Sequence, residues 1–291
     1  MGLAIHVVIP THLPRYLDLV LAGLARQTRR ADTVLVSCDT DDPAIGEVIE
    51  QCARIMSMPI WWVRRPAQEG ERLCQVRNNG VRALLEHAGA RATSDQRLLI
   101  LDGDMLAPEG LVAAHLECAA DLVYPYRIEV GEARSKEINA ARIFERGLEL
   151  SPSNAEMDKL RARDRRYRKH LLMRRLHFGP LHKPKLLGGH FSTHMDLYDQ
   201  LNGFDELYRG WGFKDDEFAY RAAKIGARAR AACAAIPAWH LYHTTRQAGV
   251  RMADLPTAQR FAQRGRLPTI CEHGLRNCLT QPMPEVQRFG A

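Results

Sequence analysis

The chain has 291 residues, of which 46% are hydrophobic and 26% charged, and its formal net charge is +7. These values are ordinary for a globular protein, and the length suits one large α/β domain or two small ones. The charge is concentrated between Asp158 and Lys185, where eleven Lys and Arg accompany two Asp, so the rest of the chain carries a net charge of −2. A protein that is basic throughout, as a nucleic-acid coat would be, is therefore disfavoured.

Strand-like and helix-like segments alternate over the first third of the chain. Apolar runs of strand length are each followed by apolar residues at helical spacing. Because these strands are apolar on both faces, they indicate a parallel sheet covered by helices, with ligands at the carboxyl ends of the strands. In chain order we predict a strand at 3–9, a helix at 16–25, a strand at 33–37, a helix at 43–56, a strand at 59–63, a helix at 70–87 and a strand at 97–101.

The alternation breaks after the segment 123–126. Residues 131–185 are mostly helical by composition and form a basic insertion. Prolines interrupt the last part of the chain. We therefore predict a single α/β domain over 1–249 and an extension over 250–291. The remaining predicted elements are a strand at 186–192, helices at 195–202 and 215–225, and a strand at 228–235.

Several features bear on the cellular compartment. No run of 18 apolar residues occurs, so we expect no membrane-spanning helix. The sequence begins without a basic segment or a cleavage site, so we expect no secretory signal. Single cysteines in apolar surroundings are typical of reduced thiols, and we therefore expect a cytoplasmic protein. Five cysteines show this pattern: Cys38, Cys52, Cys74, Cys118 and Cys233.

Two carboxylates follow the strand at 97–101 directly. Asp102 and Asp104 flank Gly103, and side chains two residues apart in an extended segment point the same way. Carboxylate oxygens suit Mg²⁺ or Mn²⁺, ions that also bind phosphate. The alternative is a solvated turn, for which Asp-Gly is well suited. The motif alone leaves both interpretations open.

Two histidines, His240 and His243, follow a short predicted strand and a proline. Together with carboxylates they can complete a mixed site for Mn²⁺. The alternative is a structural turn built with the neighbouring Trp239 and Tyr242.

The segment 203–217 combines glycines, aromatic residues and acids. Trp211 beside Gly212 is typical of a platform on which the apolar face of a sugar stacks. Asp215 and Asp216 open a predicted helix, where the helix dipole favours carboxylates. Asp215 is therefore either a capping residue or a general base.

In this order, the motifs resemble those of inverting glycosyltransferases of the GT-A fold, family 2, and the C-terminal motif of β-1,4-galactosyltransferases. The resemblance covers about residues 4–245. It implies an α/β, Rossmann-like GT-A domain whose mostly parallel sheet is flanked by helices, and a cofactor that is Mn²⁺ or Mg²⁺. The matching segments are Val7–Thr11, Asp39, Arg77–Gly80, Leu101–Asp104, Gly188–Ser192, Gly203–Glu217 and His240–His243.

The resemblance also implies roles for individual residues. The donor would be bound by Pro10, Thr11, Asp39, Arg77, Asp102 and Gly103. The acceptor would be bound by Gly189, His190, Trp211, Gly212 and Asp216. The metal would be held by Asp102 and Asp104 with His240, His243 or both, and Asp215 would be the catalytic base.

The implied reaction moves a sugar from a nucleotide diphosphate, a UDP-sugar if Asp39 contacts the base, to a hydroxyl of a carbohydrate or glycolipid acceptor. Such a reaction would serve surface polysaccharide or glycoconjugate synthesis. Two positions depart from the family pattern: Lys214 replaces a Glu and His190 replaces an Asn. Lys214 leaves open a catalytically impaired module that binds a nucleotide sugar or an anionic partner. A sugar-1-phosphate nucleotidyltransferase is a further alternative, although Pro10–Pro14 is not its glycine-rich basic loop.

The basic residues between 158 and 185 recur at helical spacing. They predict a solvated helix, a contact with anionic lipid on the inner face of the membrane, or a grip on an anionic acceptor. The basic run Lys159–Arg175 lacks interleaved stacking aromatic residues beyond Tyr167, so we expect no nucleic-acid partner.

Overall fold

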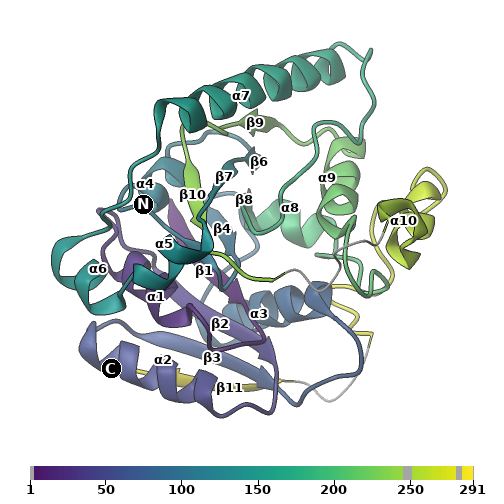
Figure 1. The fold of residues 1–291 in the computed structure, drawn as a ribbon. Helices are drawn as coiled ribbons and strands as arrows, with labels where there is room; N and C mark the ends of the chain where they lie inside the picture. The colour runs from purple at the N-terminus through teal and green to yellow at the C-terminus, as the bar shows by residue number, and fades with distance from the viewer. Residues whose placement is uncertain (1–2, 245–250, 280–283, 291) are drawn as a thin grey trace.

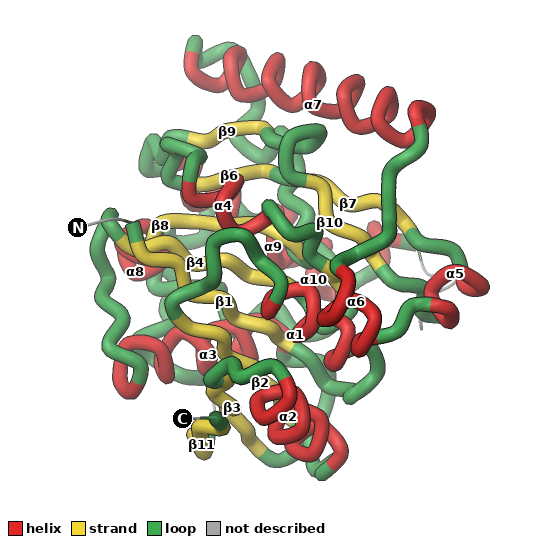
Figure 2. Tube along the Cα trace, turned by 90° about the vertical axis from the view of Figure 1, so that its left-hand side faces the viewer, coloured by secondary structure: helices red, strands yellow, loops and turns green. Residues whose placement is uncertain are grey.

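A large mixed sheet with helices on both faces forms the centre of the protein. The structure is a computed structural model that describes residues 3–244, 251–279 and 284–290. Among these residues the sheet has eight strands in the order β11-β3-β2-β1-β4-β8-β6-β9 (Figures 1 and 2). Its strands are β1 (Ala4–Pro10), β2 (Thr33–Asp39), β3 (Ile60–Arg65), β4 (Gln96–Leu101), β6 (Leu122–Tyr124), β8 (His190–His194), β9 (Ala229–Ala231) and β11 (Glu285–Phe289).

The first four strands pair in parallel, as predicted. β1 pairs with both β2 and β4, and β2 pairs with β3, so the carboxyl ends of these strands meet at one edge of the sheet. β8 runs antiparallel to its neighbours β4 and β6. The predicted α/β class and flanking helices are therefore confirmed, with the parallel pairings concentrated in one half of the sheet.

Helices fill both faces because the strand residues alternate between two cores. Ile5 and Val7 of β1 pack on one face with α1 (Leu17–Ala25) and α2 (Ala44–Ile55). Val8 and Leu35 pack on the other face with three further helices. Those helices are α3 (Leu73–His87), α8 (Met195–Gln200) and α9 (Lys214–Lys224). The short α4 (Leu111–Leu116), which the sequence analysis did not predict, extends the first face.

The insertion at 131–185 is helical, as predicted. It contains α5 (Glu132–Glu137), α6 (Ala140–Arg146) and α7 (Asn154–Arg175). A small second sheet lies beside it, in the order β5-β10-β7. Its strands are β5 (Met105–Leu106), β7 (Tyr126–Glu129) and β10 (Pro237–His240).

Two predicted strands differ from those in the structure. The strand predicted at 186–192 begins only at His190, because 186–189 forms a loop and turn that leads into the sheet. The strand predicted at 228–235 is limited to 229–231, where it pairs with β6.

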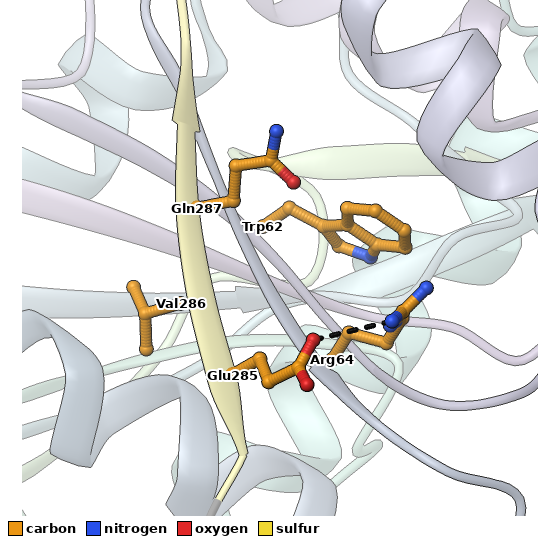
Figure 3. A pocket seen from close by; sticks show the side chains of 5 residues that line it. All are labelled: Trp62, Arg64, Glu285, Val286 and Gln287. Carbon is orange, nitrogen blue, oxygen red and sulfur yellow. Dashed lines mark hydrogen bonds and ion pairs between the residues drawn. The ribbon is translucent and has the colours of Figure 1, made fainter.

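The end of the chain packs against the domain. The short 3₁₀ helix η1 (Met252–Asp254) and α10 (Pro256–Ala262) lie beside the loop that precedes α9, and β11 adds an antiparallel edge strand to β3. A shallow pocket at that edge is lined by residues of β3 and β11 (Figure 3). The predicted boundary between residues 249 and 250 lies outside the described residues.

The features that bear on compartment are also visible. The five cysteines expected to be reduced are buried and unpaired. Among the described residues, no helix combines the length and the apolar character needed to cross a membrane.

Candidate active site

The loop after β4 brings Asp102 and Asp104 to the carboxyl edge of the sheet. The Asp102 amide donates to the Gly189 carbonyl (2.8 Å) and the Gly103 amide to the Pro10 carbonyl (3.2 Å), which fixes the loop between β1 and β8. A Cβ at Gly103 would lie 2.7 Å from Thr11 Oγ1, closer than side chains tolerate. Only glycine fits between the two carboxylates. Pro10 and Thr11 therefore contact the loop that carries the two carboxylates.

Asp104 and the two histidines form one cluster. Asp104 Oδ2 lies 3.5 Å from His240 Nε2 and 3.2 Å from His243 Nε2. One oxygen and two ring nitrogens of these three residues all lie within 4.8 Å of one another. The structure thus brings together both histidine candidates, so the spacing of three residues places two imidazoles on one carboxylate.

The backbone around β10 holds this cluster in place. The Leu241 amide donates to the Asp104 carbonyl (2.9 Å). The Tyr242 carbonyl accepts from the Tyr16 hydroxyl (2.8 Å) and from Arg15 Nη2 (3.0 Å). On the far side of His240, Nδ1 lies 2.6 Å from Glu129 Oε2 at the end of β7. A carboxylate behind a histidine in this way fixes the ring orientation and leaves Nε2 facing the cluster.

Electrostatics couple the three residues. Burial acts to raise the pKa of Asp104, but the hydrogen bonds with His240 and His243 outweigh it and hold that pKa well below its usual range. Burial acts to lower the pKa of His240, yet Asp104 and Glu129 raise it to about 9. The hydrogen bond with Asp104 raises the pKa of His243 as well. The carboxylate is therefore stabilised by positive charge on the imidazoles, a role that a divalent cation can take over.

The donor set fits a transition-type divalent cation. One carboxylate oxygen and two imidazole nitrogens suit Mn²⁺ better than Mg²⁺, which prefers oxygen ligands alone. Asp102 is not part of the cluster. Its Oδ1 instead accepts from Arg77 Nη2 at 3.2 Å.

Arg77 of α3 connects Asp102 to the start of α9. Its Nη1 donates to Asp215 Oδ1 (2.6 Å) and its Nη2 also donates to the Gly188 carbonyl (2.9 Å). The guanidinium is 1% exposed and lies over the Phe204 ring, 4.9 Å from its centroid. Burial acts to lower the pKa of Arg77, but the charges of Asp215 and Asp102 outweigh it and raise that pKa. Arg77 is thus a fixed cation between two carboxylates that the sequence places 113 residues apart.

The two glycines before β8 make room for this arrangement. A Cβ at Gly188 would overlap the Asp215 carboxyl group, and a Cβ at Gly189 would lie 3.1 Å from Asp102 Oδ2. Gly189 therefore lies against Asp102, and a side chain at Gly188 is excluded because it would occupy the space of the Asp215 carboxyl group.

The pKa values of Asp102 and Asp216 are both raised above the usual value of an aspartate. Partial burial raises the pKa of Asp102 to about 6, against the opposing charge of Arg77. Burial also raises the pKa of Asp216 to about 6. Lys185 Nζ lies 3.8 Å from Asp216 Oδ2, and within the described residues the buried Oδ1 has no hydrogen-bond partner. One oxygen of Asp216 is thus buried without a partner among the described residues, while the other lies near Lys185.

Asp39 lies at the end of β2, where a base contact was expected. Its carboxylate forms an ion pair with the fully buried Arg65 and accepts from Arg65 Nε at 3.0 Å. Burial raises the pKa of Asp39, against the opposing effect of Arg65. The Asp39 side chain remains 10% exposed. Its ion pair with Arg65 fixes its orientation at the edge of the sheet.

The remaining candidates occupy different places. Trp211 is 45% exposed and its carbonyl accepts from Thr257 Oγ1 (2.6 Å), which ties it to the C-terminal extension. Gly212 has a φ of +88°, a conformation that favours glycine. Lys214 is buried, pairs with Glu71 and donates to the Gly210 carbonyl (2.8 Å).

His190 differs from its predicted place. Its ring is fully buried and its Nε2 lies 2.8 Å from Nε2 of His115 on α4, beneath the sheet. Because successive strand residues point to opposite faces, His190 points away from the face that Gly189 and Asp102 share with the loop. The structure therefore does not place this imidazole where an acceptor could reach it.

Glu129 and Arg65 were not found from the sequence. Glu129 ends a strand of four residues, and Arg65 ends a strand without any recognised motif. Each acts on a candidate residue far away in sequence, so only the pairing of strands reveals the contact.

The family comparison covers part of this site. Residues 169–244, about a quarter of the chain, match a family model described as the N-terminal domain of galactosyltransferase. The match includes the glycine pair, Asp215 and both histidines. A comparison with curated proteins finds no match.

Solved structures of similar fold come from the S. aureus protein TarS. One structure of TarS has a TM-score of 0.52 with 14% identity, covering 82% of this chain and 37% of that one. TarS 1–349 in complex with UDP has a TM-score of 0.52 with 16% identity, covering 81% and 60%. TarS 1–349 in complex with UDP-GlcNAc has a TM-score of 0.54 with 14% identity, covering 90% and 72%. This chain therefore spans little more than a third of the longest of these structures.

These comparisons bear on the fold of the protein and on its class of enzyme. The protein has the GT-A fold of glycosyltransferases, with a large central sheet flanked by helices. The family match and the likeness of fold together support a glycosyltransferase.

Proposed function

We propose that this protein is a metal-dependent, inverting glycosyltransferase that moves a sugar from a UDP-sugar to a hydroxyl of a carbohydrate or glycolipid acceptor. One observation carries the proposal. Asp104 belongs to a cluster with the ligands of a divalent cation (Asp104, His240, His243) and lies on the same loop as Asp102, which Arg77 joins to Asp215. Candidate groups for leaving-group stabilisation and for proton removal are thus linked through this loop and one arginine.

The donor is a nucleotide diphosphate sugar. The TarS structures of similar fold contain UDP and UDP-GlcNAc. In a sheet of this kind ligands bind outside the carboxyl ends of the strands. Pro10, Thr11, Asp39 and Gly103 occupy those ends in this chain, and Asp39, oriented by Arg65, is the candidate contact of the base.

Asp104, His240 and His243 would hold Mn²⁺. When bound, the ion would neutralise the charge that develops on the departing diphosphate. Mg²⁺ is the alternative cofactor, although two imidazole ligands favour Mn²⁺.

Asp215 is the proposed general base. It would take the proton of the acceptor hydroxyl as that oxygen attacks the anomeric carbon, which inverts the configuration in a single displacement. Arg77 orients the carboxylate through Oδ1. Asp216, Gly189, Trp211 and Gly212 are the proposed acceptor contacts, with Trp211 supplying an exposed ring and Asp216 an unpartnered oxygen among the described residues.

The contacts of Lys214 favour an active enzyme over a catalytically impaired module. Lys214 stands where the family pattern has a Glu that can contact the acceptor. Its ammonium group instead pairs with Glu71 and the Gly210 carbonyl inside the protein. Asp215 and Asp216 at the start of α9 therefore remain as the acidic side chains proposed for the acceptor side. Lys214 instead stabilises this part of the protein from the inside.

The test is release of UDP from UDP-sugars with a titration of Mn²⁺. We expect turnover that EDTA abolishes and Mn²⁺ restores, and a much higher Mn²⁺ requirement in Asp104→Asn. Glu145→Gln, which changes an exposed carboxylate of α6, is the matched control and should behave as wild type. If none of the UDP-, GDP- or dTDP-sugars released its nucleoside diphosphate, a binding module would remain, and turnover with GDP-sugars alone would overturn the role of Asp39 in choosing uracil.

A further inference from the structure

The long helix α7 lies at the margin of the molecule, where it covers β9 (Figures 1 and 2). Only three of its 22 residues are buried: Leu160, Asp164 and Tyr167. Asp164 Oδ1 accepts from the Cys233 amide (2.9 Å) and Tyr167 packs edge-on against Tyr124. These contacts fix which face of the helix points inward. The residues of the opposite face are exposed over most of the length of the helix.

The outward face carries cations without acidic partners. At 100° per residue, Arg165, Lys169, Leu172 and Leu176 lie opposite the buried residues. Within the part of the chain that the structure describes, no ion pair engages Arg165, Arg166 or Lys169. The two acids of the helix beyond its first turn are already paired, Asp158 with Arg161 and Asp164 with Arg168. This face therefore presents uncompensated positive charge.

Apolar side chains gather at the carboxyl end of the same face. Leu172 is 57% exposed, Leu176 54% and Phe178 80%, the most exposed large apolar residue of the described chain. The chain turns at His177, whose φ is +60°, and the Phe178 amide donates to the Met173 carbonyl (2.9 Å). This turn holds the Phe178 ring outward instead of letting it fold onto the helix.

We propose that this surface, defined by Arg165, Arg166, Lys169, Leu172, Leu176 and Phe178, docks on an anionic lipid bilayer. Charge complementarity to anionic headgroups accounts for the unpaired cations. Leucine and phenylalanine that enter the acyl boundary account for the exposed apolar cluster. A soluble anionic polymer would match the cations but would leave Phe178 and Leu176 in water. An anionic bilayer satisfies both halves of the surface.

The test is cosedimentation of the full chain with vesicles. We expect binding to vesicles of phosphatidylglycerol mixed with phosphatidylcholine, weak binding to pure phosphatidylcholine, and loss of binding as salt rises. Each cation near an anionic surface strengthens binding about fivefold, so the triple variant Arg165→Glu/Arg166→Glu/Lys169→Glu should partition at least a hundredfold less. Arg30→Glu/Arg54→Glu/Lys224→Glu, at exposed positions elsewhere, changes the net charge equally and should still bind.

The apolar half has its own pair of variants. Leu176→Ser/Phe178→Ser should weaken binding to anionic vesicles about tenfold or more, because each side chain loses its burial in the acyl boundary. Ile55→Ser/Ile270→Ser, at residues 54% and 57% exposed, is the matched control and should have no effect. Thermal unfolding checks that every variant folds. Unchanged vesicle binding in the α7 variants, or binding to heparin but not to vesicles, would overturn the proposal.

Discussion

Asp102 and Asp104 lie two residues apart on one loop, yet their surroundings are opposite. Asp102 faces a guanidinium that belongs to the protein and that is itself shared with Asp215. Asp104 faces two imidazoles, and its pKa is held low while that of Asp102 is raised to about 6. One carboxylate thus belongs to an arrangement whose charge is compensated internally. The other belongs to a cluster whose positive charge is carried by protons.

The difference suggests that the two carboxylates of this Asp-Gly-Asp segment have different roles. A guanidinium cannot be exchanged, so the Asp102–Arg77–Asp215 arrangement is preorganised and fixes Asp215 relative to the loop. Protons on imidazoles can be exchanged for a metal ion. The cluster of Asp104, His240 and His243 is therefore the variable part of the site, and Asp102 belongs with the fixed part.

The largest effect is expected from Asp215→Asn, which changes the fixed arrangement around Arg77. We expect sugar transfer to fall about a thousandfold or more, since general base catalysis contributes 10²–10⁴-fold in typical enzymes. The amide keeps an oxygen for Arg77, so the fixed arrangement and the binding of UDP and Mn²⁺ should survive. Steady-state kinetics and calorimetry measure the two effects separately.

Asp216→Asn is the comparison variant for this prediction. If Asp216 only contacts the acceptor, its loss should appear mainly in KM for the acceptor. Full turnover in Asp215→Asn together with a lost kcat in Asp216→Asn would transfer the role of base to Asp216, whose pKa of about 6 also suits it.

Removal of the fixed cation should cost stability. In Arg77→Met, Asp102 and Asp215 lose their shared partner and face each other as like charges. We expect the free energy of unfolding to fall by about 3 kcal/mol, the lower end for breaking a buried ion pair, because both carboxylates are partly exposed. Urea denaturation measures the change.

Arg26→Met is the matched control for Arg77→Met. It breaks the surface pair with Glu109, whose side chains are 39% and 41% exposed, and should cost under about 1 kcal/mol. Equal stability of Arg77→Met and wild type would show that Arg77 serves binding alone.

His190 and His115 offer a contrast to these clusters, because no carboxylate among the described residues contacts either buried imidazole. Burial lowers the pKa of His190 from 6.5 to about 3 and that of His115 well below its usual range. The unfolded chain binds protons at these histidines below pH 6.5 and the folded chain does not, so stability is lost as pH falls from 6.5 towards 3. His190 alone should cost about 2 kcal/mol by pH 5.

The variant His190→Asn isolates this effect. Its stability should fall by about 2 kcal/mol less than that of wild type between pH 7 and pH 5, whatever its stability at pH 7. Urea denaturation at both pH values gives the difference. Parallel curves for the two proteins would mean that His190 is already accessible to protons in the folded state.

Sequence patterns predict the parts of this structure that depend on residues close together in the chain. The strands and helices up to residue 101 were predicted because apolar spacing is a local property, and the position of Asp102 at a strand end followed from it. The fold class was confirmed on this basis. The contact of Arg77 with Asp215 and that of Glu129 with His240 depend on strand order and on an insertion, so no local pattern predicted them. His190 shows the opposite case, because a motif match says nothing about which face of a strand a side chain takes.

The smallest expected effect concerns the variable cluster. Glu129 contacts His240 on the side away from Asp104, with Oε2 2.6 Å from Nδ1. Glu129→Gln keeps an oxygen for that contact but removes the charge that makes His240 a stronger ligand. Loss of such a carboxylate typically weakens metal binding 10–100-fold, and we expect about tenfold for Mn²⁺, measured by titration calorimetry. Glu132→Gln, which breaks only an exposed pair with Lys136, should leave Mn²⁺ affinity unchanged. If Glu129→Gln also binds Mn²⁺ as wild type does, the ring of His240 is positioned by β10 alone, and the cluster is as preorganised as the arrangement around Arg77.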